Sequence, residues 1–221
     1  KRLTYSYNVN WLSWIKGAYF QLYFFKSIYY CIHMFTYKKK YFLIIESIKD
    51  IDLKKIKKLN KFYIIYRNAK NNENYADLLD FRKYCKLKSI KFFVANNYKL
   101  AISLNSDGIY LSSHNKSLRA LSLKKSNFDI IGSAHSFKEI HRKTIQGCSS
   151  IFFSKLFLVN YDKMAPFLGV IKFNKYLINN KYLIPLGGIN SNNLNKLKQL
   201  NCQSIAILSE IKKKPAIIRR L

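Results

Sequence analysis

The sequence predicts a (β/α)8 barrel, which is one α/β domain of eight parallel strands separated by helices. From Lys39 onward, short apolar runs rich in β-branched and aromatic residues alternate with segments of helical period. The apolar runs are continuous, which is typical of parallel strands that are buried on both faces. Eight such units fit into about 180 residues, a length that suits one compact barrel with few insertions.

Each strand is predicted from its own apolar run. In chain order these runs are YFLII (41–45), FYIIY (62–66), IKFFV (90–94), GIYL (108–111), DIIG (129–132), SIFF (150–153), YLIPL (182–186) and SIAIL (204–208). Helices are expected between them at 52–59, 75–85, 98–104, 117–123, 137–146, 169–178 and 192–200, followed by a short tail from Ile211. The spacing leaves one long connection, 154–168, which is a candidate lid over the site.

The composition is that of a globular chain with an extreme basic charge. Hydrophobic residues make up 49% and charged residues 23% of the 221 residues, which excludes a disordered chain. The chain has forty Lys and Arg residues but only eleven Asp and Glu residues, which gives a net charge of +29. This charge is typical of proteins that bind nucleic acid or an anionic membrane, but it also follows from the biased composition of AT-rich coding sequences. Because lysines are spread over nearly every helical segment, we favour the second explanation and expect neither partner.

The four cysteines are far apart in the sequence. Cys31, Cys85, Cys148 and Cys202 form no C-x-x-C pair, so the spacing typical of metal ligands is absent. No disulfide framework is expected, and a reducing cytoplasmic setting is the simpler inference.

The first 38 residues differ from the repeat. Residues 11–35 are crowded with aromatic side chains and are long enough for a membrane span, but two lysines and a histidine interrupt them. Three interpretations remain: a mis-assigned start with the natural one near Met34, a membrane-surface helix, or an extra helical hairpin. The expected division is therefore an extension, 1–38, and a barrel, 39–221.

Two loops at the end of the repeat carry the features of a phosphate site. Gly187 and Gly188 follow the seventh expected strand, where paired glycines let backbone N–H groups approach an anion. Ser209 follows the eighth strand, and the loops after strands 7 and 8 form the phosphate site of many β/α barrels. A tight turn between a strand and a helix is the alternative explanation for the glycines.

Basic residues on other strand-end loops extend this prediction. Arg67 and Lys70 follow the second strand, and Lys163 lies in the long loop after the sixth. Because the carboxyl ends of parallel strands meet at one end of a barrel, these side chains are expected to form an anion-binding mouth. The predicted ligand is a small phosphorylated molecule.

Five short motifs, in this order, resemble the thiamine phosphate synthase and TenI family of small barrels. They are YFLII at 41–45, YR at 66–67, DGIYL at 107–111, IGSAHS at 131–136, and PLGGI at 185–189 with LSEI at 208–211. The resemblance covers roughly residues 40–211. It implies a role in thiamine biosynthesis, with thiazole phosphate held by Gly187, Gly188 and Ser209.

The resemblance also implies a reaction. In the synthase, a pyrimidine pyrophosphate ionises at its methylene carbon with help from Mg²⁺ and basic residues, and the thiazole nitrogen captures the cation. That reaction needs the developing charge of the pyrophosphate to be neutralised. Arg67 and the hydroxyl of Ser133 match positions that hold the pyrophosphate, and Lys163 stands near the family's strand-6 lysine.

The chain departs from the family at the metal site. The synthase binds Mg²⁺ through two aspartates, whereas this chain has Asn96 and Asn115 at those positions. Replacing both carboxylates by neutral amides is expected to weaken Mg²⁺ binding considerably. TenI relatives lack these carboxylates, and some catalyse a thiazole tautomerisation through the histidine of the strand-5 motif, which is His135 here.

Three functions remain open. The family resemblance favours a thiamine phosphate synthase. A TenI-like tautomerase with His135 as proton shuttle is the second, because the near-neutral pKa of histidine suits proton transfer to and from carbon. A non-catalytic barrel that binds a phosphorylated ligand or nucleic acid is the third.

Overall fold

The barrel is seen in a computed structural model that describes residues 39–56, 61–68, 73–123, 128–159, 162 and 164–208. The expectations for the extension 1–38 and for the tail from Ile211 lie outside the described residues. The strands are β1 (Lys40–Ile45), β2 (Phe62–Tyr66), β3 (Lys91–Ala95), β4 (Gly108–Leu111), β5 (Asp129–Ala134), β6 (Ser150–Phe153), β7 (Leu183–Pro185) and β8 (Ser204–Ile207). The prediction of eight strands from eight apolar runs is confirmed.

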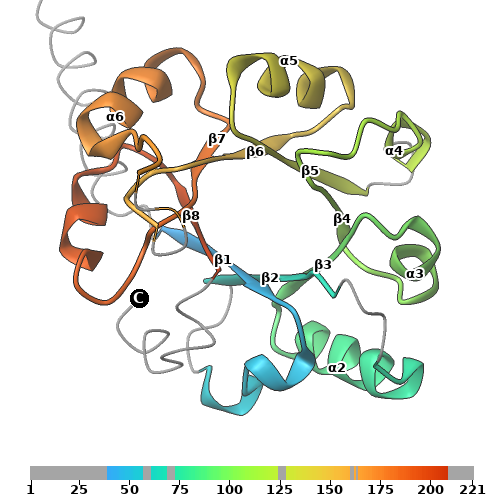
Figure 1. Ribbon diagram of the computed structural model, residues 1–221. Helices are drawn as coiled ribbons and strands as arrows, with labels where there is room; N and C mark the ends of the chain where they lie inside the picture. The colour runs from blue at the N-terminus through green and yellow to red at the C-terminus, as the bar shows by residue number, and fades with distance from the viewer. Residues whose placement is uncertain are drawn as a thin grey trace, which may run out of the picture. The chain divides into compact units, whose positions relative to one another are not determined.

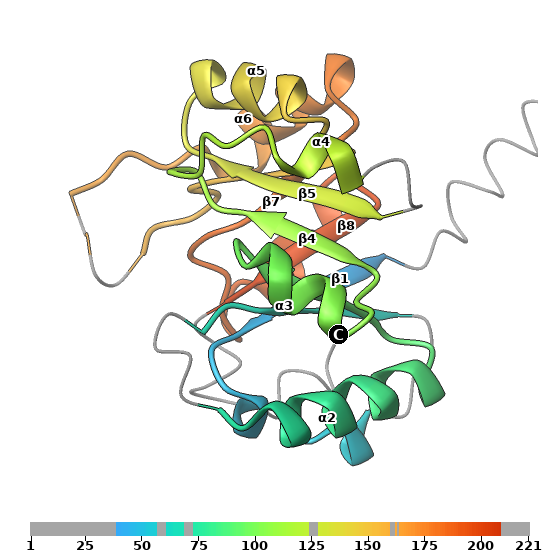
Figure 2. The same cartoon turned by 90° about the vertical axis from the view of Figure 1, so that its right-hand side faces the viewer.

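All neighbouring strands pair in parallel in the order β7-β6-β5-β4-β3-β2-β1-β8. The two end strands approach each other, so the sheet nearly closes into a barrel with helices around it (Figure 1). In Figure 2, the described parts of the segment between β6 and α6 project from the side at which β4 ends. The fold class predicted from the sequence is therefore confirmed.

Five α-helices and three short 3₁₀ segments connect the described strands. They are η1 (Ile48–Asp50), η2 (Leu53–Lys55), α2 (Tyr75–Leu87), α3 (Tyr98–Ser103), α4 (Ala120–Leu123), α5 (Phe137–Ile145), α6 (Gly169–Asn179) and η4 (Leu194–Gln199). The five α-helices lie within the segments predicted to be helical, or extend them by one or two residues.

The first and the last of the predicted helices are wrong in type. In the segment after β1, Ser47 and Asp52 each accept a hydrogen bond from a backbone N–H two residues later, at Lys49 and Lys54. Such local bonds favour separate short turns over one continuous helix. In the segment after β7, the side chain of Asn193 accepts the N–H of Asn190 at 2.9 Å, so the 3₁₀ turn begins only at Leu194.

The interior of the barrel is filled by side chains that alternate along the strands. Phe42, Phe93, Tyr110 and Phe152 belong to this buried inner cluster. The ring centroids of Phe42 and Phe152 lie 5.2 Å apart, and those of Tyr110 and Phe152 lie 5.5 Å apart. Large rings from facing strands therefore fill the barrel axis.

Gly108 makes room for one of these rings. A Cβ atom at this position would collide with the carbonyl oxygen of Asp129 and lie 2.7 Å from the ring of Phe93. The missing side chain at the start of β4 thus allows Phe93 to occupy the inner layer. The opposite strand faces pack on the surrounding helices in a second, larger apolar cluster.

A buried cation lies beside the start of β4. Arg82 on α2 is 7% exposed; its guanidinium lies 3.0 Å from the Asp107 carboxylate and donates to the carbonyl oxygen of Asn105. These contacts lie at the amino ends of the strands, the end of a β/α barrel associated with stability.

Among the described residues, none of the helices is long and apolar enough to cross a membrane.

Candidate active site at the carboxyl ends of the strands

A polar network closes the inner layer at the carboxyl ends of the strands. Tyr110 of β4 is 2% exposed, and its phenol lies near the hydroxyl of Ser133 of β5 and the guanidinium of Arg67, which follows β2. Burial raises the pKa of Tyr110, while the Ser133 hydroxyl and the positive charge of Arg67 act in the opposite direction. The phenol therefore stays protonated, and it joins two residues predicted to bind pyrophosphate.

Arg67 is positioned by β1 as well as by Tyr110. Its backbone N–H donates to the carbonyl oxygen of Ile45 at 2.8 Å, and its guanidinium lies 3.8 Å from the carboxylate of Glu46. Both side chains of this ion pair are partly exposed, and exposed pairs at this distance contribute little to stability. The guanidinium thus remains available to an anionic ligand.

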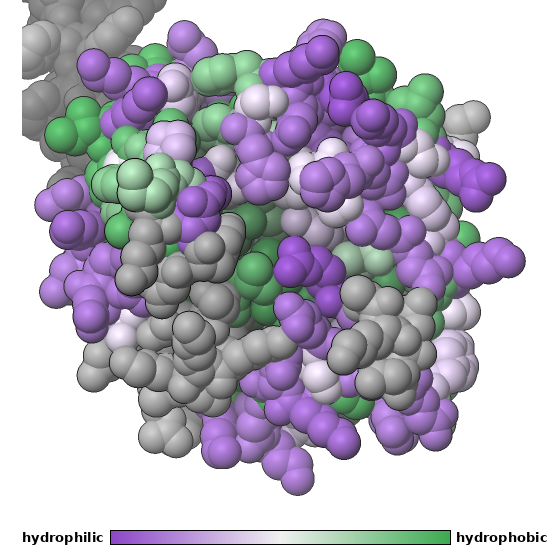
Figure 3. Space-filling view, in the orientation of Figure 1, coloured by the Kyte–Doolittle hydropathy of each residue, from purple (hydrophilic) through white to green (hydrophobic). Residues whose placement is uncertain are grey.

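The face that carries these residues is hollowed near its centre. In Figure 3 the hollow has a hydrophobic floor, and hydrophilic side chains lie along part of its rim. This distribution is common for small-molecule sites, which are mostly apolar with a few polar groups that orient the ligand.

His135 lies exposed at the end of β5. Its ring Nδ1 is 2.7 Å from the hydroxyl Oγ of Ser154, which follows β6. Its backbone N–H donates to the Glu139 carboxylate at 2.7 Å, while Ser136 accepts the N–H of Glu139 and caps α5. The cap fixes the backbone of His135, and the Ser154 hydroxyl fixes the ring.

The two residues at the family's metal positions contact each other directly. The Asn115 side chain donates from Nδ2 to Oδ1 of Asn96 at 3.0 Å. Asn96 also accepts the backbone N–H of Ser112 at 3.0 Å and donates to its hydroxyl at 3.1 Å. Asn96 has a φ of 56°, a left-handed conformation that asparagine tolerates better than most residues. The loops after β3 and β4 are thus joined amide to amide.

These residues do not fit a Mg²⁺ ion. Magnesium is bound in proteins mainly by carboxylates, water and substrate phosphates, whereas the donors here are two neutral amides that already bond to each other. Within the described part of the chain, no group of three or more His, Cys, Asp or Glu side chains is placed to hold a metal. The weakening of Mg²⁺ binding that the sequence leads us to expect stays a prediction.

The Gly187–Gly188 turn follows β7 and lies against the backbone of the β6 loop. Both glycines have a left-handed φ, 99° and 69°. A Cβ atom on Gly188 would collide with the carbonyl oxygen of Phe157 and lie 2.5 Å from that of Leu158. Among the described residues, no backbone acceptor is bonded to the N–H of either glycine. The tight-turn explanation therefore holds, and the phosphate prediction remains compatible with it.

The described ends of the β6 loop are tied to this turn and to α6. Leu156 and Phe157 donate backbone N–H groups to the carbonyl oxygens of Leu186 and Gly187, at 2.9 and 3.0 Å. At the other end, the N–H of Leu168 donates to the carbonyl oxygen of Lys155 at 3.0 Å. A lid formed by this loop would therefore move only between these anchored ends.

Three predicted site residues lie outside the described residues: Lys70, Lys163 and Ser209. The others, Arg67, Ser133, His135, Asn96, Asn115, Gly187 and Gly188, all lie at the carboxyl ends of strands. Sequence reasoning gave no role to Tyr110 or Ser154. A tyrosine in the otherwise apolar run GIYL was a usable signal, whereas Ser154 offered none.

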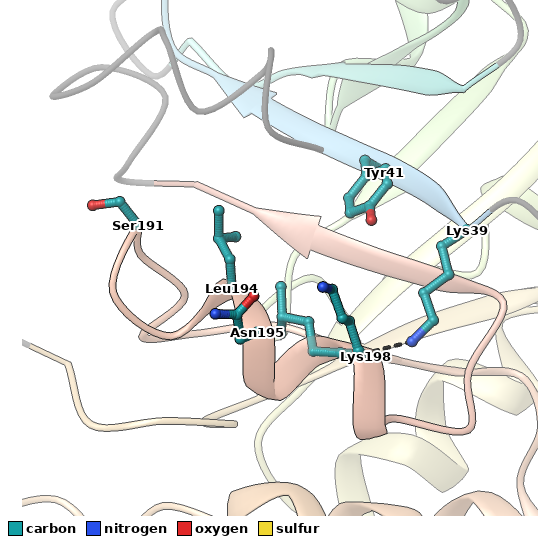
Figure 4. A pocket seen from close by; sticks show the side chains of 7 residues that line it. Lys39, Tyr41, Ser191, Leu194, Asn195 and Lys198 are labelled. Atoms are coloured by element: carbon teal, nitrogen blue, oxygen red, sulfur yellow. Dashed lines mark hydrogen bonds between the residues drawn. The ribbon is translucent and has the colours of Figure 1, made fainter.

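A separate cavity of about 360 Å³ lies beside the barrel, between η4 and the start of β1 (Figure 4). It is lined by Lys39, Tyr41, Ser191, Leu194, Asn195, Leu197 and Lys198. The ammonium of Lys39 donates to the carbonyl oxygens of Leu197 and Leu200 at 2.6 and 2.8 Å, and burial lowers its pKa. Its charge thus caps the end of η4.

Comparison with known proteins gives consistent matches. Residues 53–211 match the family model described as thiamine monophosphate synthase. The thiamine-phosphate synthase of Prochlorococcus marinus is 27% identical over 149 residues, which cover 66% of this chain and 42% of the relative. That of Persephonella marina is 24% identical over 151 residues, covering 66% and 70%. The chain thus spans less than half the length of the first relative.

A similar fold is found among solved structures. Thiamine phosphate pyrophosphorylase from Pyrococcus furiosus superposes with a TM-score of 0.63 at 17% identity, covering 83% of this chain and 95% of that protein. At this identity, the likeness concerns the fold alone.

Proposed function

Because the chain belongs to the thiamine monophosphate synthase family, we propose that it joins a thiazole phosphate to a pyrimidine pyrophosphate and so makes thiamine phosphate. The observation that carries this proposal is the network of Arg67, Tyr110 and Ser133 at the carboxyl ends of the strands. It offers a cation and a hydroxyl to an anionic ligand at the end of the barrel where β/α enzymes carry their active sites.

The two substrates are assigned to opposite sides of the mouth. The thiazole phosphate is proposed to bind at the Gly187–Gly188 turn, with Ser209 as a further donor. Support comes from the N–H groups of the two glycines, which have no backbone acceptor among the described residues, since such groups bind phosphate oxygens well. The pyrophosphate is proposed to bind Arg67 and Ser133, with Lys70 and Lys163 as additional cations.

In the proposed reaction, the bond between the pyrimidine methylene carbon and the pyrophosphate oxygen breaks, and its electron pair leaves with the pyrophosphate. The lone pair of the thiazole nitrogen then forms the new bond to that carbon. The role of Arg67 is to neutralise charge as it develops on the leaving oxygens, which lowers the energy of the transition state. No proton transfer is required.

A second function is favoured by the amide pair and by His135. The direct contact of Asn96 with Asn115 leaves two neutral donors where pyrophosphate chemistry uses a metal, whereas thiazole tautomerisation needs only a proton shuttle. His135 is exposed at the end of β5 and is oriented by Ser154, as a shuttle would be. The three free cysteines of the described residues support the proposal that either enzyme works in the cytoplasm.

The deciding experiment is a synthesis assay with the purified full chain. Thiazole phosphate and pyrimidine pyrophosphate are incubated with the protein in MgCl₂ or in EDTA, and thiamine phosphate is quantified. Product from wild type that falls at least tenfold in Arg67→Met supports the synthase. If wild type makes none but interconverts thiazole tautomers, and His135→Ala does not, the tautomerase replaces it. Inactivity in both assays refutes both enzymatic proposals.

A further inference from the structure

A buried lysine lies behind the loop that carries Asn115. Lys143, on α5, is 0% exposed. Its ammonium donates to the carbonyl oxygens of Ser112 and Asn115 at 2.6 and 2.8 Å, and to the side-chain oxygen of Gln146 at 2.9 Å. All three ammonium hydrogens are therefore used by neutral acceptors. Burial lowers the pKa of Lys143, as expected for a charge that has lost its water.

Gln146 completes the attachment of α5 to this loop. It is also 0% exposed, and its amide nitrogen donates to the carbonyl oxygens of Asn115 and Ser117 at 3.1 and 2.8 Å. Together, the two side chains hold three backbone carbonyl groups of the segment that follows β4. These four bonds restrain the conformation of the loop.

The opposite side of the same loop is held by Asn96. The backbone N–H of Ser112 and the side-chain amide of Asn115 both donate to Oδ1 of Asn96, while the carbonyl groups of the same two residues bond to Lys143. The loop is thus clamped between α5 behind it and the end of β3 in front. A divalent cation bound by carboxylates from both loops would impose the same restraint.

We propose that Lys143 is a positioning residue that holds Asn115 against Asn96 and so fixes this side of the mouth without a metal ion. The fixed amide groups then form part of the surface that the pyrophosphate contacts, a consequence that rests on the proposed function. Burying a charged ammonium costs desolvation free energy, whereas an apolar side chain of similar size would fill the same space without that cost. Its two bonds to carbonyl oxygens of the loop give it a role that packing alone does not.

The first test needs no ligand. In NMR spectra, the side-chain amide signals of Asn96 and Asn115 are expected to be dispersed and to exchange slowly with water in wild type. In Lys143→Met, they are expected to move to the positions of solvent-exposed amides. Arg82→Met, which removes a buried cation at the other end of the barrel, is the matched control and should leave both signals in place. Unchanged signals in Lys143→Met would overturn the proposal.

Gln146→Glu keeps the test decisive if Lys143→Met does not fold. The substitution gives the buried ammonium a carboxylate partner while removing both donors to the carbonyl groups of Asn115 and Ser117. The Asn115 amide signal is expected to shift and broaden in this variant. A signal that stays where it is in wild type contradicts the clamp.

The second test measures binding of inorganic pyrophosphate by calorimetry, in EDTA and in MgCl₂. Wild type is expected to bind pyrophosphate with the same affinity in both buffers, and Lys143→Met with about tenfold lower affinity in both. A tenfold loss is the lower end of the range for mutation of a residue that orients a binding side chain. Recovery of Lys143→Met by Mg²⁺ would contradict the proposal. Failure of wild type to bind pyrophosphate would instead count against the proposed function, while the NMR result stands by itself.

Discussion

The hydroxyl of Ser154 lies 2.7 Å from Nδ1 of His135, and this contact joins the ends of the neighbouring strands β6 and β5 at the mouth of the barrel. Nδ1 accepts in this contact when the ring proton is on Nε2, and donates when the proton is on Nδ1. In either case the neighbouring strand orients the ring and distinguishes its two nitrogens.

Ser154→Ala is expected to mix the two tautomers of His135, because the ring loses the bond that distinguishes its nitrogens. Any proton transfer by His135 should slow about tenfold, which is less than the roughly 10²–10⁴-fold contributed by a whole acid–base residue. The ¹⁵N chemical shifts of the ring report the tautomer directly. Ser149→Ala, a serine just before the start of β6 that donates to the carbonyl oxygen of Ile130, is the control. Identical ring shifts in wild type and Ser154→Ala would show that the contact has no such role.

Gly188→Ala is expected to destabilise the barrel by about 3 kcal/mol, the sum of a left-handed backbone conformation and a collision with the β6 loop. Gly169→Ala is the matched control, because its φ is also 69° but nothing lies within 4 Å of its Cβ position. That control should lose only about 1 kcal/mol. Thermal unfolding separates them, with Tm losses of roughly 6–12 °C and 2–4 °C. Equal losses would mean that the collision is relieved by loop movement.

The double variant Asn96→Asp/Asn115→Asp is expected to create a dependence of stability on Mg²⁺. Two carboxylates placed where the amides now lie 3.0 Å apart repel each other, and a divalent cation removes the repulsion. At a hundred times its Kd, Mg²⁺ stabilises a folded chain by about 2.7 kcal/mol. The Tm of the variant should therefore rise on adding MgCl₂, whereas that of wild type should not. A variant that ignores Mg²⁺ would show that further ligands are missing.

Cys85 is expected to make the protein less stable in alkaline solution. It is 0% exposed, and burial raises its pKa from 9.0 to about 12. Above pH 9, the unfolded chain loses the thiol proton while the folded chain keeps it, so the free energy of unfolding falls by about 1.4 kcal/mol per pH unit up to the folded pKa. Urea unfolding at pH 8 and pH 10 should show a decline in wild type that is smaller by about this amount in Cys85→Ala. Parallel declines would disprove the assignment.

The sequence was sufficient for the strands because each is a continuous apolar run. The runs at 62–66, 108–111 and 150–153 coincide with β2, β4 and β6 residue for residue. The helices before β2 and β8 were wrong because the side chains of Asp52 and Asn193 bond to nearby backbone N–H groups. The spacing of hydrophobic residues along the sequence does not reveal such hydrogen bonds.

Much of the mouth was also predictable, since a parallel barrel brings every strand end to one face. This rule placed Arg67, Ser133 and His135 there. The role of Lys143 could not be predicted in this way, because nothing in the sequence distinguishes it from the other lysines and arginines, forty basic residues in all. Its importance arises only when α5 packs on the β4 loop and removes its ammonium from water.

The aromatic filling of the barrel has a consequence for ligand entry. Because the rings of Phe42, Phe93 and Phe152 occupy the barrel axis, the mouth is closed at its inner end by side chains. Any ligand of this mouth must therefore enter and leave through the same opening, because the filled interior leaves no passage along the barrel axis.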